Sequence, residues 1–467
     1  MSRSSPARRQ PPHNHGSSTP PPRPPQPQPP ALLPPVSLLD CVVFCVCLAP
    51  QLLLQAGPWA TFACILRALP FLAFRMPVDV ARRQWTARRQ RQRQRPSIFE
   101  DIVLCCVRWA FVHMPPRVGR VFFSRPVALP FFQFRQLRHD GVWRTFRAAA
   151  SYMLSLLTSL RGVSLWSISR SRKPNDQFSK GIWISHDETQ PADIVIFFVH
   201  GGGFVLGSSH FYLEFLRTWM ALLLGDSQDD KVSDKKPRFY NPAFYSLDYT
   251  LAPDAVFPTQ LDEALQAYDY VVTTAAQDSS TRVVVAGDSA GGAIVLSLLL
   301  RLSQKRQKRY DTAPPLPRMP DQAILISPWV SLWSQRYRRS ANDYIDAASL
   351  AGYAAQYVGS EATAAELAAN PKRVDPLLSP GHCHDGDWWR RASPSRRLFV
   401  TYGEEEVFAP EIRAWAEALQ ADGVSVQTSV DPGGLGVHAW PVASLFLART
   451  NARRFEGLRR IVEAMRV

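Results

Sequence analysis

The sequence contains no Asn-x-Ser/Thr acceptor for N-glycosylation, and after Cys106 it contains a single cysteine, Cys383. A disulfide needs two cysteines, so no disulfide framework can stabilise the C-terminal region of the chain. Both absences are typical of a domain in a reducing compartment. They favour a cytosolic position and leave a luminal one open.

Acidic residues are scarce beside basic ones: 39 Asp and Glu stand against 54 Lys and Arg, for a net charge of +15. The excess is concentrated in an arginine-rich tract at residues 75–96, where Asp79 is the only acidic residue. A tract of this kind binds anionic surfaces. No nucleic-acid-binding motif accompanies it, so we expect no nucleic-acid partner and predict contact with lipid headgroups.

The chain begins with two segments that differ sharply from the rest. Residues 1–30 are rich in Pro, Ser, Gln and Arg, and we expect a disordered tail because they cannot bury enough apolar surface to fold. Residues 31–74 contain only two charged residues, Asp40 and Arg67. Within them, the stretch 36–55 has the length of ~20 residues that spans a bilayer. The sequence therefore predicts a membrane-associated segment at 31–74.

Prolines and a glycine divide this apolar segment, so its topology stays open. Pro50, the Gly57–Pro58 pair and Pro70 allow one span plus an interfacial helix, or a hairpin that enters and leaves one membrane face. An apolar helix packed on the following domain is the alternative without a membrane. Because Lys and Arg tend to remain in the cytosol, the arginine-rich tract places that domain on the cytosolic side.

The remaining chain divides at about residue 161. Residues 97–160 contain two segments with helical periodicity, 99–114 and 142–160, which we expect to form a cap over a site or a collar at the membrane. From 161 to 467, apolar strands alternate with amphipathic helices, a pattern typical of a mostly parallel sheet with helices on both faces. Strands are predicted at 163–169, 181–187, 193–200, 243–249, 281–289, 322–327, 396–403 and 424–431.

Ser289 is the candidate nucleophile. It lies in Gly-Asp-Ser-Ala-Gly (287–291), directly after a buried strand and directly before a helix. A serine at such a turn is held in a strained, exposed conformation, and the flanking glycines let strand and helix approach each other. The motif alone occurs often by chance, but this strand–turn–helix context indicates an α/β-hydrolase fold.

A run of glycines supplies the candidate oxyanion hole. His-Gly-Gly-Gly (200–203) follows another buried strand, and glycines let backbone N–H groups approach a reacting carbonyl. In this fold one set of donors comes from such a loop, and another from the residue after the nucleophile. We therefore expect the N–H groups of Gly201, Gly202 and Ala290 to bind the oxyanion.

A serine nucleophile needs a base and an acid that orients the base, and in this fold they follow it in the order acid, then histidine. His438 lies in a glycine-rich loop after a predicted strand, which is where the base belongs. Glu404, Glu405 and Glu406 follow the preceding strand, and we choose Glu406, with Glu405 as the alternative. His382 and His384 lie in a polar loop, and we expect no metal there.

Four ordered motifs resemble the hormone-sensitive-lipase family of α/β-hydrolases: HGGGF at 200–204, DYTLAPDAVFP at 248–258, GDSAGG at 287–292 and SPW at 327–329. The resemblance covers about 193–450 and implies an esterase or lipase that needs no metal or organic cofactor. Carried over residue by residue, it gives a triad of Ser289, Glu406 and His438, with Glu406 where the family often has Asp. The apolar N-terminal segment also resembles membrane-bound fungal steryl acetyl hydrolases. This resemblance implies a luminal orientation, which opposes the charge argument.

These observations predict a membrane-associated serine carboxyl-ester hydrolase that cleaves apolar acyl or acetyl esters, in the endoplasmic reticulum or at lipid droplets. The alternative is a ligand-binding protein on the same fold that has lost turnover. Because Ser289 and His438 are both present, the enzyme is favoured. The sequence does not specify the acyl chain or the alcohol.

Overall fold

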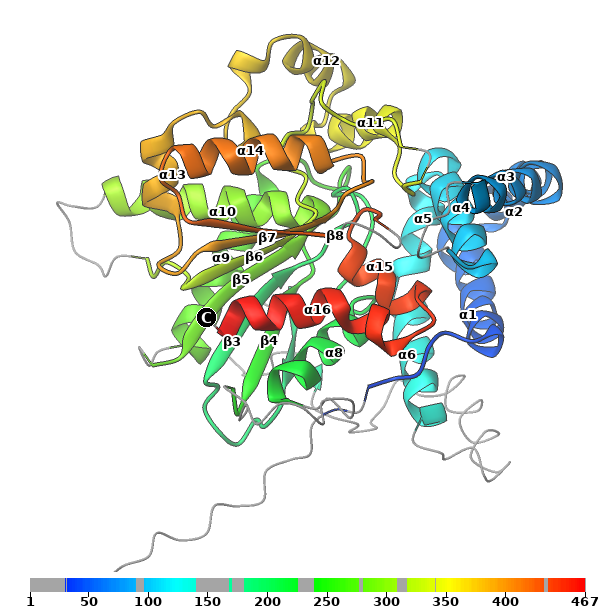
Figure 1. Cartoon of the computed structure of the whole chain (residues 1–467), viewed down its shortest axis with the longest axis horizontal. Helices are drawn as coiled ribbons and strands as arrows, with labels where there is room; N and C mark the ends of the chain where they lie inside the picture. The colour runs from blue at the N-terminus through cyan, green and yellow to red at the C-terminus, as the bar shows by residue number, and fades with distance from the viewer. Residues whose placement is uncertain are drawn as a thin grey trace, which may run out of the picture.

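The computed structural model describes residues 30, 32–89, 96–139, 168–169, 180–225, 239–276, 280–308, 317–340, 342–431 and 436–466. Residues 1–29 of the predicted tail, residues 90–95 of the arginine-rich tract and the predicted helix at 142–160 lie outside this part of the chain. The described residues contain both the strand–helix region and most of the apolar N-terminal segment (Figure 1).

A mostly parallel sheet forms the centre of the molecule, as predicted (Figure 1). Its eight described strands run in the order β1-β2-β4-β3-β5-β6-β7-β8. The β1–β2 and β2–β4 pairs are antiparallel, and all other neighbours are parallel. The strands are β1 (Ile168–Ser169), β2 (Gly181–Ser185), β3 (Ile194–Val199), β4 (Pro242–Leu247), β5 (Arg282–Asp288), β6 (Gln322–Ile326), β7 (Leu398–Gly403) and β8 (Val426–Asp431).

Helices cover both faces of the sheet because its central strands are apolar on both sides. Along β3, alternate side chains enter two separate cores: Val195, Phe197 and Val199 pack on one face, and Ile194, Ile196 and Phe198 pack on the other. The first core is closed by α9 (Thr259–Ala275), α10 (Ser289–Lys308), α13 (Gly386–Ala392) and α14 (Ala409–Ala421). The second is closed by α8 (Leu213–Leu224), α15 (Trp440–Leu447) and α16 (Asn451–Arg466).

The N-terminal region forms a helical group beside the sheet (Figure 1). Two long helical arms, residues 38–56 and 58–89, are joined at Gly57 and come first; together they are called the N-terminal hairpin below. Its elements are α1 (Leu38–Gln51), η1 (Leu52–Ala56), α2 (Pro58–Pro70), η2 (Phe71–Arg75) and α3 (Met76–Arg89). Three further helices follow: α4 (Ile98–His113), α5 (Pro116–Phe123) and α6 (Arg125–His139).

A buried ion-pair network fixes the start of the hairpin to the sheet region. The Arg135 guanidinium on α6 lies 3.0 Å from Asp40 on α1 and 2.8 Å from Glu214 on α8. Asp40 and Arg135 are almost completely buried. Removing one partner of such a pair leaves an uncompensated buried charge and costs about 3–5 kcal/mol. The first arm of the hairpin therefore packs against the folded domain.

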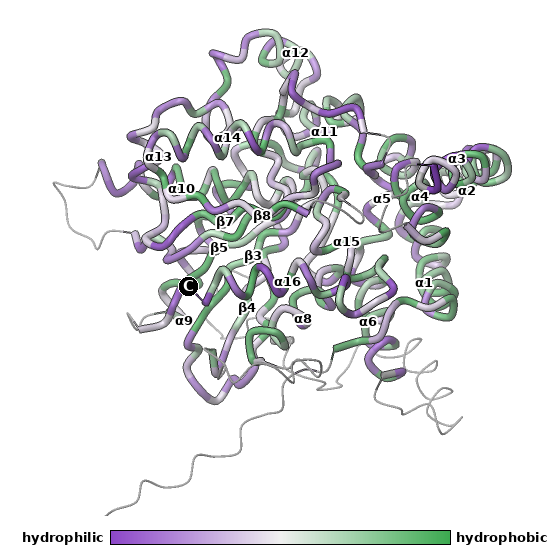
Figure 2. The backbone as a smooth tube through the Cα atoms, viewed as in Figure 1, coloured by the Kyte–Doolittle hydropathy of each residue, from purple (hydrophilic) through white to green (hydrophobic). Residues whose placement is uncertain are grey.

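The opposite face of the hairpin is apolar and exposed. Two helical stretches, Leu38–Ala56 and Pro58–Thr86, are long and apolar enough to cross a membrane by length and composition alone. Only 11% of each apolar window is buried. Figure 2 shows the hydrophobic colour along α1 and α2. Leu54 and Trp59, near the bend between the arms, are 78% and 84% exposed.

Two more helices lie beyond the carboxyl end of the sheet. They are α11 (Ala347–Val358) and α12 (Glu361–Ala369), and in the chain they lie between β6 and α13. Asp346 caps α11, since its carboxylate accepts the N–H groups of Ala348 and Ser349. These helices lie above α14 in Figure 1, and α11 also borders the site described next.

Candidate active site

Ser289 lies at a tight turn between β5 and α10. Its backbone φ is +52°, a left-handed conformation that is strained for a residue with a side chain. Two glycines make the turn possible. A Cβ on Gly291 would lie 2.1 Å from the carbonyl oxygen of Val199, and one on Gly287 would lie 2.6 Å from the Gly291 carbonyl carbon. The structure thus gives a steric reason for both glycines of the sequence motif.

The glycine loop after β3 lies beside this turn, and it requires one correction to our prediction. The Gly201 N–H donates to Oδ1 of Asp288 at 2.8 Å, so it is not available to an oxyanion. Gly202 and Gly203, in contrast, line the same pocket as Ser289. Among the described residues, the N–H groups of Gly202, Gly203 and Ala290 have no acceptor. The sequence could not reveal this difference, because the competing acceptor lies 87 residues away.

Asp288 locks the glycine loop to the turn that carries the serine. Its second oxygen accepts the Tyr212 hydroxyl at 2.7 Å, and its side chain is buried. Burial raises the pKa of Asp288 to about 6, and the hydrogen bonds from Tyr212 and Gly201 oppose that rise. The Asp288 carboxylate therefore positions the glycine loop. Within the described residues it forms no hydrogen bond with His438, the predicted base.

The predicted base and acid lie close together. The Nδ1 atom of His438 is 3.9 Å from Oε1 of Glu406, and neither atom has another hydrogen-bond partner in the described structure. This separation exceeds a hydrogen bond, but catalytic contacts are often long in free enzymes and tighten with substrate. Glu405, the alternative acid, is half-exposed and pairs with Arg338 at 3.4 Å. The geometry favours Glu406.

Burial shapes the electrostatics of this pair. Glu406 is fully buried, and loss of solvation raises its pKa to about 8, although hydrogen bonds from Ser327 and Gly403 favour its charged form. Burial also lowers the pKa of His438, while the nearby carboxylates of Asp343 and Asp288 raise it. A histidine that is neutral at rest can accept a proton, which is what a general base requires.

Two residues near the base were missed by the sequence argument. Asp343 is buried, and its two oxygens accept the backbone N–H groups of His438 at 3.0 Å and Val407 at 2.8 Å. Ser327 donates to Glu406 at 2.6 Å and accepts the Ala439 N–H at 2.9 Å. Ser327 belongs to the SPW motif and could have been considered. Asp343 lies in a polar loop without a sequence motif that would indicate a role in the site.

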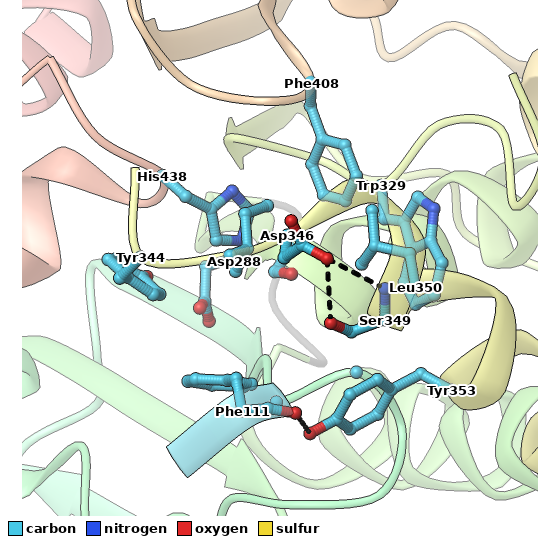
Figure 3. A pocket seen from close by; sticks show the side chains of 14 residues that line it. Phe111, Asp288, Trp329, Tyr344, Asp346, Ser349, Leu350, Tyr353, Phe408 and His438 are labelled. Atoms are coloured by element: carbon cyan, nitrogen blue, oxygen red, sulfur yellow. Dashed lines mark hydrogen bonds between the residues drawn. The ribbon is translucent and has the colours of Figure 1, made fainter. Parts of the chain in front are cut away.

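The pocket at these residues has mainly apolar walls (Figure 3). Ser289, His438, Gly202 and Gly203 form its polar side. Asp288, Asp346 and Ser349 add further polar groups to the lining. Apolar and aromatic residues form the other walls: Phe111, Trp329, Tyr344, Ile345, Leu350, Tyr353 and Phe408. Phe111 comes from α4, and its carbonyl accepts the Tyr353 hydroxyl at 3.1 Å. A helix of the N-terminal group is thus part of the pocket wall.

The same helix also holds the segment that contains Asp343. The Arg108 guanidinium donates to the carbonyls of Ser340 at 2.7 Å and Asp343 at 3.0 Å. On α5, Arg120 donates to the Val205 carbonyl at 3.0 Å, next to the glycine loop. The N-terminal helices therefore contact both the base side and the oxyanion side of the pocket.

The described side chains offer no cluster of three or more His, Cys, Asp or Glu residues that could hold a metal ion. His382, one of the two loop histidines, instead contacts the Ser379 hydroxyl through Nδ1 at 2.9 Å.

A family model described as the alpha/beta hydrolase fold matches residues 229–441, which include Ser289, Glu406 and His438. This chain has the α/β-hydrolase fold. The chain is 32% identical to human hormone-sensitive lipase over 190 residues, which cover 40% of this chain and 16% of the relative. It is 28% identical to an acetyl-hydrolase of Streptomyces hygroscopicus over 251 residues, or 52% of this chain and 68% of that one.

A putative steryl acetyl hydrolase of Schizosaccharomyces pombe, mug81, is 25% identical over 256 residues, or 52% of this chain and 59% of the yeast protein. The chain therefore spans less than two thirds of the human and yeast relatives. These similarities agree with the resemblance to hormone-sensitive lipase that the four sequence motifs indicated.

Proposed function

We propose that this α/β-hydrolase is a serine carboxyl-ester hydrolase that acts through an acyl-enzyme intermediate. One observation carries the proposal: a serine on a strained strand–helix turn shares an apolar pocket with a buried histidine and a glycine loop. The names of the relatives, acetyl-hydrolase and steryl acetyl hydrolase, support the same reaction class.

In the proposed reaction, His438 takes the proton of the Ser289 hydroxyl while its oxygen attacks the ester carbonyl. Glu406 holds the imidazole in the correct tautomer and stabilises its positive form. The tetrahedral oxyanion accepts the N–H groups of Gly202, Gly203 and Ala290, each worth about 3–4 kcal/mol in comparable sites. His438 then gives its proton to the leaving alcohol.

Deacylation repeats these steps with water. His438 removes a proton from the water molecule, whose oxygen attacks the acyl carbon, and the bond to Ser289 breaks as the serine regains its proton. Every group in this scheme is a side chain or backbone amide of the chain. We therefore propose a mechanism without a metal or organic cofactor.

The proposed substrates are apolar acyl or acetyl esters. The aromatic and aliphatic walls of the pocket exclude water from an acyl group and offer few polar partners. Hydrolysis of p-nitrophenyl acetate and butyrate by wild type and by Ser289→Ala tests the reaction class. A wild-type protein that binds these esters saturably without turning them over would favour the ligand-binding alternative.

We also propose that the N-terminal hairpin holds the enzyme at a membrane. One side of the hairpin packs against α4, α5 and α6, and the other exposes a row of large apolar side chains. Because Asp40 is paired with buried Arg135, this arrangement favours a hairpin in one membrane face over a single free span.

The arginine-rich tract supports a cytosolic orientation, at the endoplasmic reticulum or lipid droplets. Two measurements test this part of the proposal. The full chain should float with liposomes, and deletion of residues 38–89 should abolish flotation. Protease added to sealed microsomes should digest the hydrolase region, and a protected region would reverse the proposed orientation.

A further inference from the structure

A second hollow, separate from the active-site pocket, lies between the N-terminal hairpin and α4. Its volume is about 540 Å³, which is within the usual range of small-ligand sites. Six residues line it: Arg67, Pro70, Phe71, Arg75, Trp109 and His113. None of them has a role in the proposed hydrolysis. Phe111, on the same helix as Trp109, lines the active-site pocket instead.

The lining residues form two facing stripes. Arg67, Phe71 and Arg75 follow one another at intervals of four along the hairpin, and Trp109 and His113 have the same spacing on α4. Phe71 is buried and stacks on Trp109, with ring centroids 5.5 Å apart and an interplanar angle of 19°. The hollow therefore has an aromatic centre with a guanidinium toward each end of one wall.

The backbone of this wall is irregular. Residues 71–75 form a π-helical turn, in which the Met76 N–H donates to the Phe71 carbonyl five residues earlier. Pro70, which precedes the turn, has no N–H to donate. Turns of this kind are uncommon and occur frequently at functional sites. Here the π-turn connects Phe71, at the centre of the hollow, to Arg75.

The charges of the hollow are suited to an anion. No acidic residue is among its lining residues. Arg75 has one exposed partner, Asp79, at 3.9 Å, an ion pair that contributes little. Arg67 has no anionic partner among the described residues. Guanidinium groups bind phosphate through parallel hydrogen bonds, so two of them around one hollow favour a phosphate ligand.

The surroundings of the hollow are suited to the apolar part of such a ligand. Leu66, Leu69 and Phe74, which lie beside the two arginines in the chain, are 51%, 52% and 75% exposed. An anionic headgroup in the hollow would leave its acyl chains against these side chains. A free phosphate ion would make no use of them.

We propose that this hollow binds the phosphate headgroup of an anionic phospholipid in the membrane on which the hairpin rests. The proposal builds on membrane association and is independent of ester hydrolysis. Because α4 separates the hollow from the active-site pocket, a lipid bound there would also fix the orientation of that pocket toward the membrane surface.

Vesicle flotation with the full chain tests the proposal. The vesicles are phosphatidylcholine alone or phosphatidylcholine with phosphatidic acid, in about 1 M salt, where a screening length of about 3 Å removes general attraction. The test variant is Arg67→Gln with Arg75→Gln. The control, Arg82→Gln with Arg88→Gln, removes the same charge from exposed positions on α3, outside the hollow.

We expect wild type and control to prefer the phosphatidic acid vesicles, and the test variant to lose at least about tenfold of this preference. Equal losses in the two variants, or no preference in wild type, would overturn the proposal. Lysine at both positions keeps the charge but not the bidentate geometry, so Arg67→Lys with Arg75→Lys should recover only part of the preference.

Two further measurements distinguish a lipid site from a soluble-phosphate site and from a defect in the proposed catalysis. Inorganic phosphate that raises the thermal unfolding midpoint of wild type but not of the Gln variant, with vesicle preference unchanged, would identify a soluble-phosphate site and overturn the lipid assignment. Hydrolysis of p-nitrophenyl butyrate should be the same in all variants. This readout distinguishes a failure of the lipid site from a failure of the proposed catalytic function.

Discussion

Asp343 gives the sharpest test of how the base is held. Its carboxylate accepts N–H groups from three segments: His438 at 3.0 Å, Val407 at 2.8 Å and its own neighbour Tyr344 at 2.8 Å. It thus joins the base loop, the loop that follows Glu406 and the entry to α11. The substitution Asp343→Asn keeps the shape of the side chain, but its NH₂ group must then face a backbone N–H.

The magnitude follows from that mismatch. One buried N–H loses its acceptor, which costs about 1–3 kcal/mol. The least costly amide orientation leaves the Val407 N–H, next to Glu406, without an acceptor. We expect the resulting displacement of the acid and base to decrease kcat by roughly 10- to 100-fold. The loss of negative charge also removes a contribution that raises the pKa of His438. The pKa of His438 therefore falls further. The part of the pH–rate profile that reflects deprotonation of His438 then moves to lower pH.

Steady-state hydrolysis of p-nitrophenyl butyrate between about pH 5 and 10 measures both effects. Asp387→Asn is the matched control, because it makes the same chemical change at an exposed carboxylate that pairs with exposed Arg390 and does not line the pocket. We expect a lower kcat, a nearly unchanged KM and a shifted limb for Asp343→Asn only. A variant with wild-type kcat and only a lower unfolding midpoint would refute the positioning role and leave a structural one.

Three further predictions concern the acid, the turn and the pocket wall. Burial raises the pKa of Glu406 to about 8, so kcat/KM should increase with pH up to about 8. The substitution Glu406→Gln should abolish this pH dependence. The substitution Glu405→Gln should leave near-full activity. The raised pKa also makes the fold lose stability as pH rises from about 4.5 to 8, so thermal unfolding of Glu406→Gln should depend less on pH. Gly291→Ala places a Cβ 2.1 Å from the Val199 carbonyl oxygen and should abolish activity or folding, measured by hydrolysis and circular dichroism. Phe111→Ala enlarges the pocket and should shift the preference from acetate to longer acyl chains on an ester panel; an unchanged profile would place Phe111 outside the acyl path.

The sheet could be predicted because each central strand is buried on both faces and reads as an apolar run. The segment 193–200 contains β3, and the glycine loop and the serine turn follow strands whose ends meet at one edge of the sheet. This geometry makes a site from motifs that lie far apart in the chain. The strands and the motifs that follow them are local patterns, so they can be recognised in the sequence.

Other parts of the site could not be predicted because they depend on which groups compete for one hydrogen bond. Gly201 and Gly202 are equivalent in the sequence, and only the position of Asp288 separates them. Glu405 and Glu406 are likewise adjacent and chemically identical. One is half-exposed beside Arg338 and the other is buried near the base, a difference set by the tertiary structure.

The role of α4 follows from the contacts that residues spaced three and four apart make along one of its faces. Near its start, buried Asp101 pairs with Arg83 of the hairpin at 2.7 Å. One turn later Leu104 packs on Val437, next to the predicted base. Arg108 and Phe111 then reach the Asp343 segment and the pocket wall. A single rigid helix thus contacts both the apolar hairpin and the groups proposed to act on the ester. We therefore predict that the proposed membrane binding and the proposed ester hydrolysis are coupled through α4.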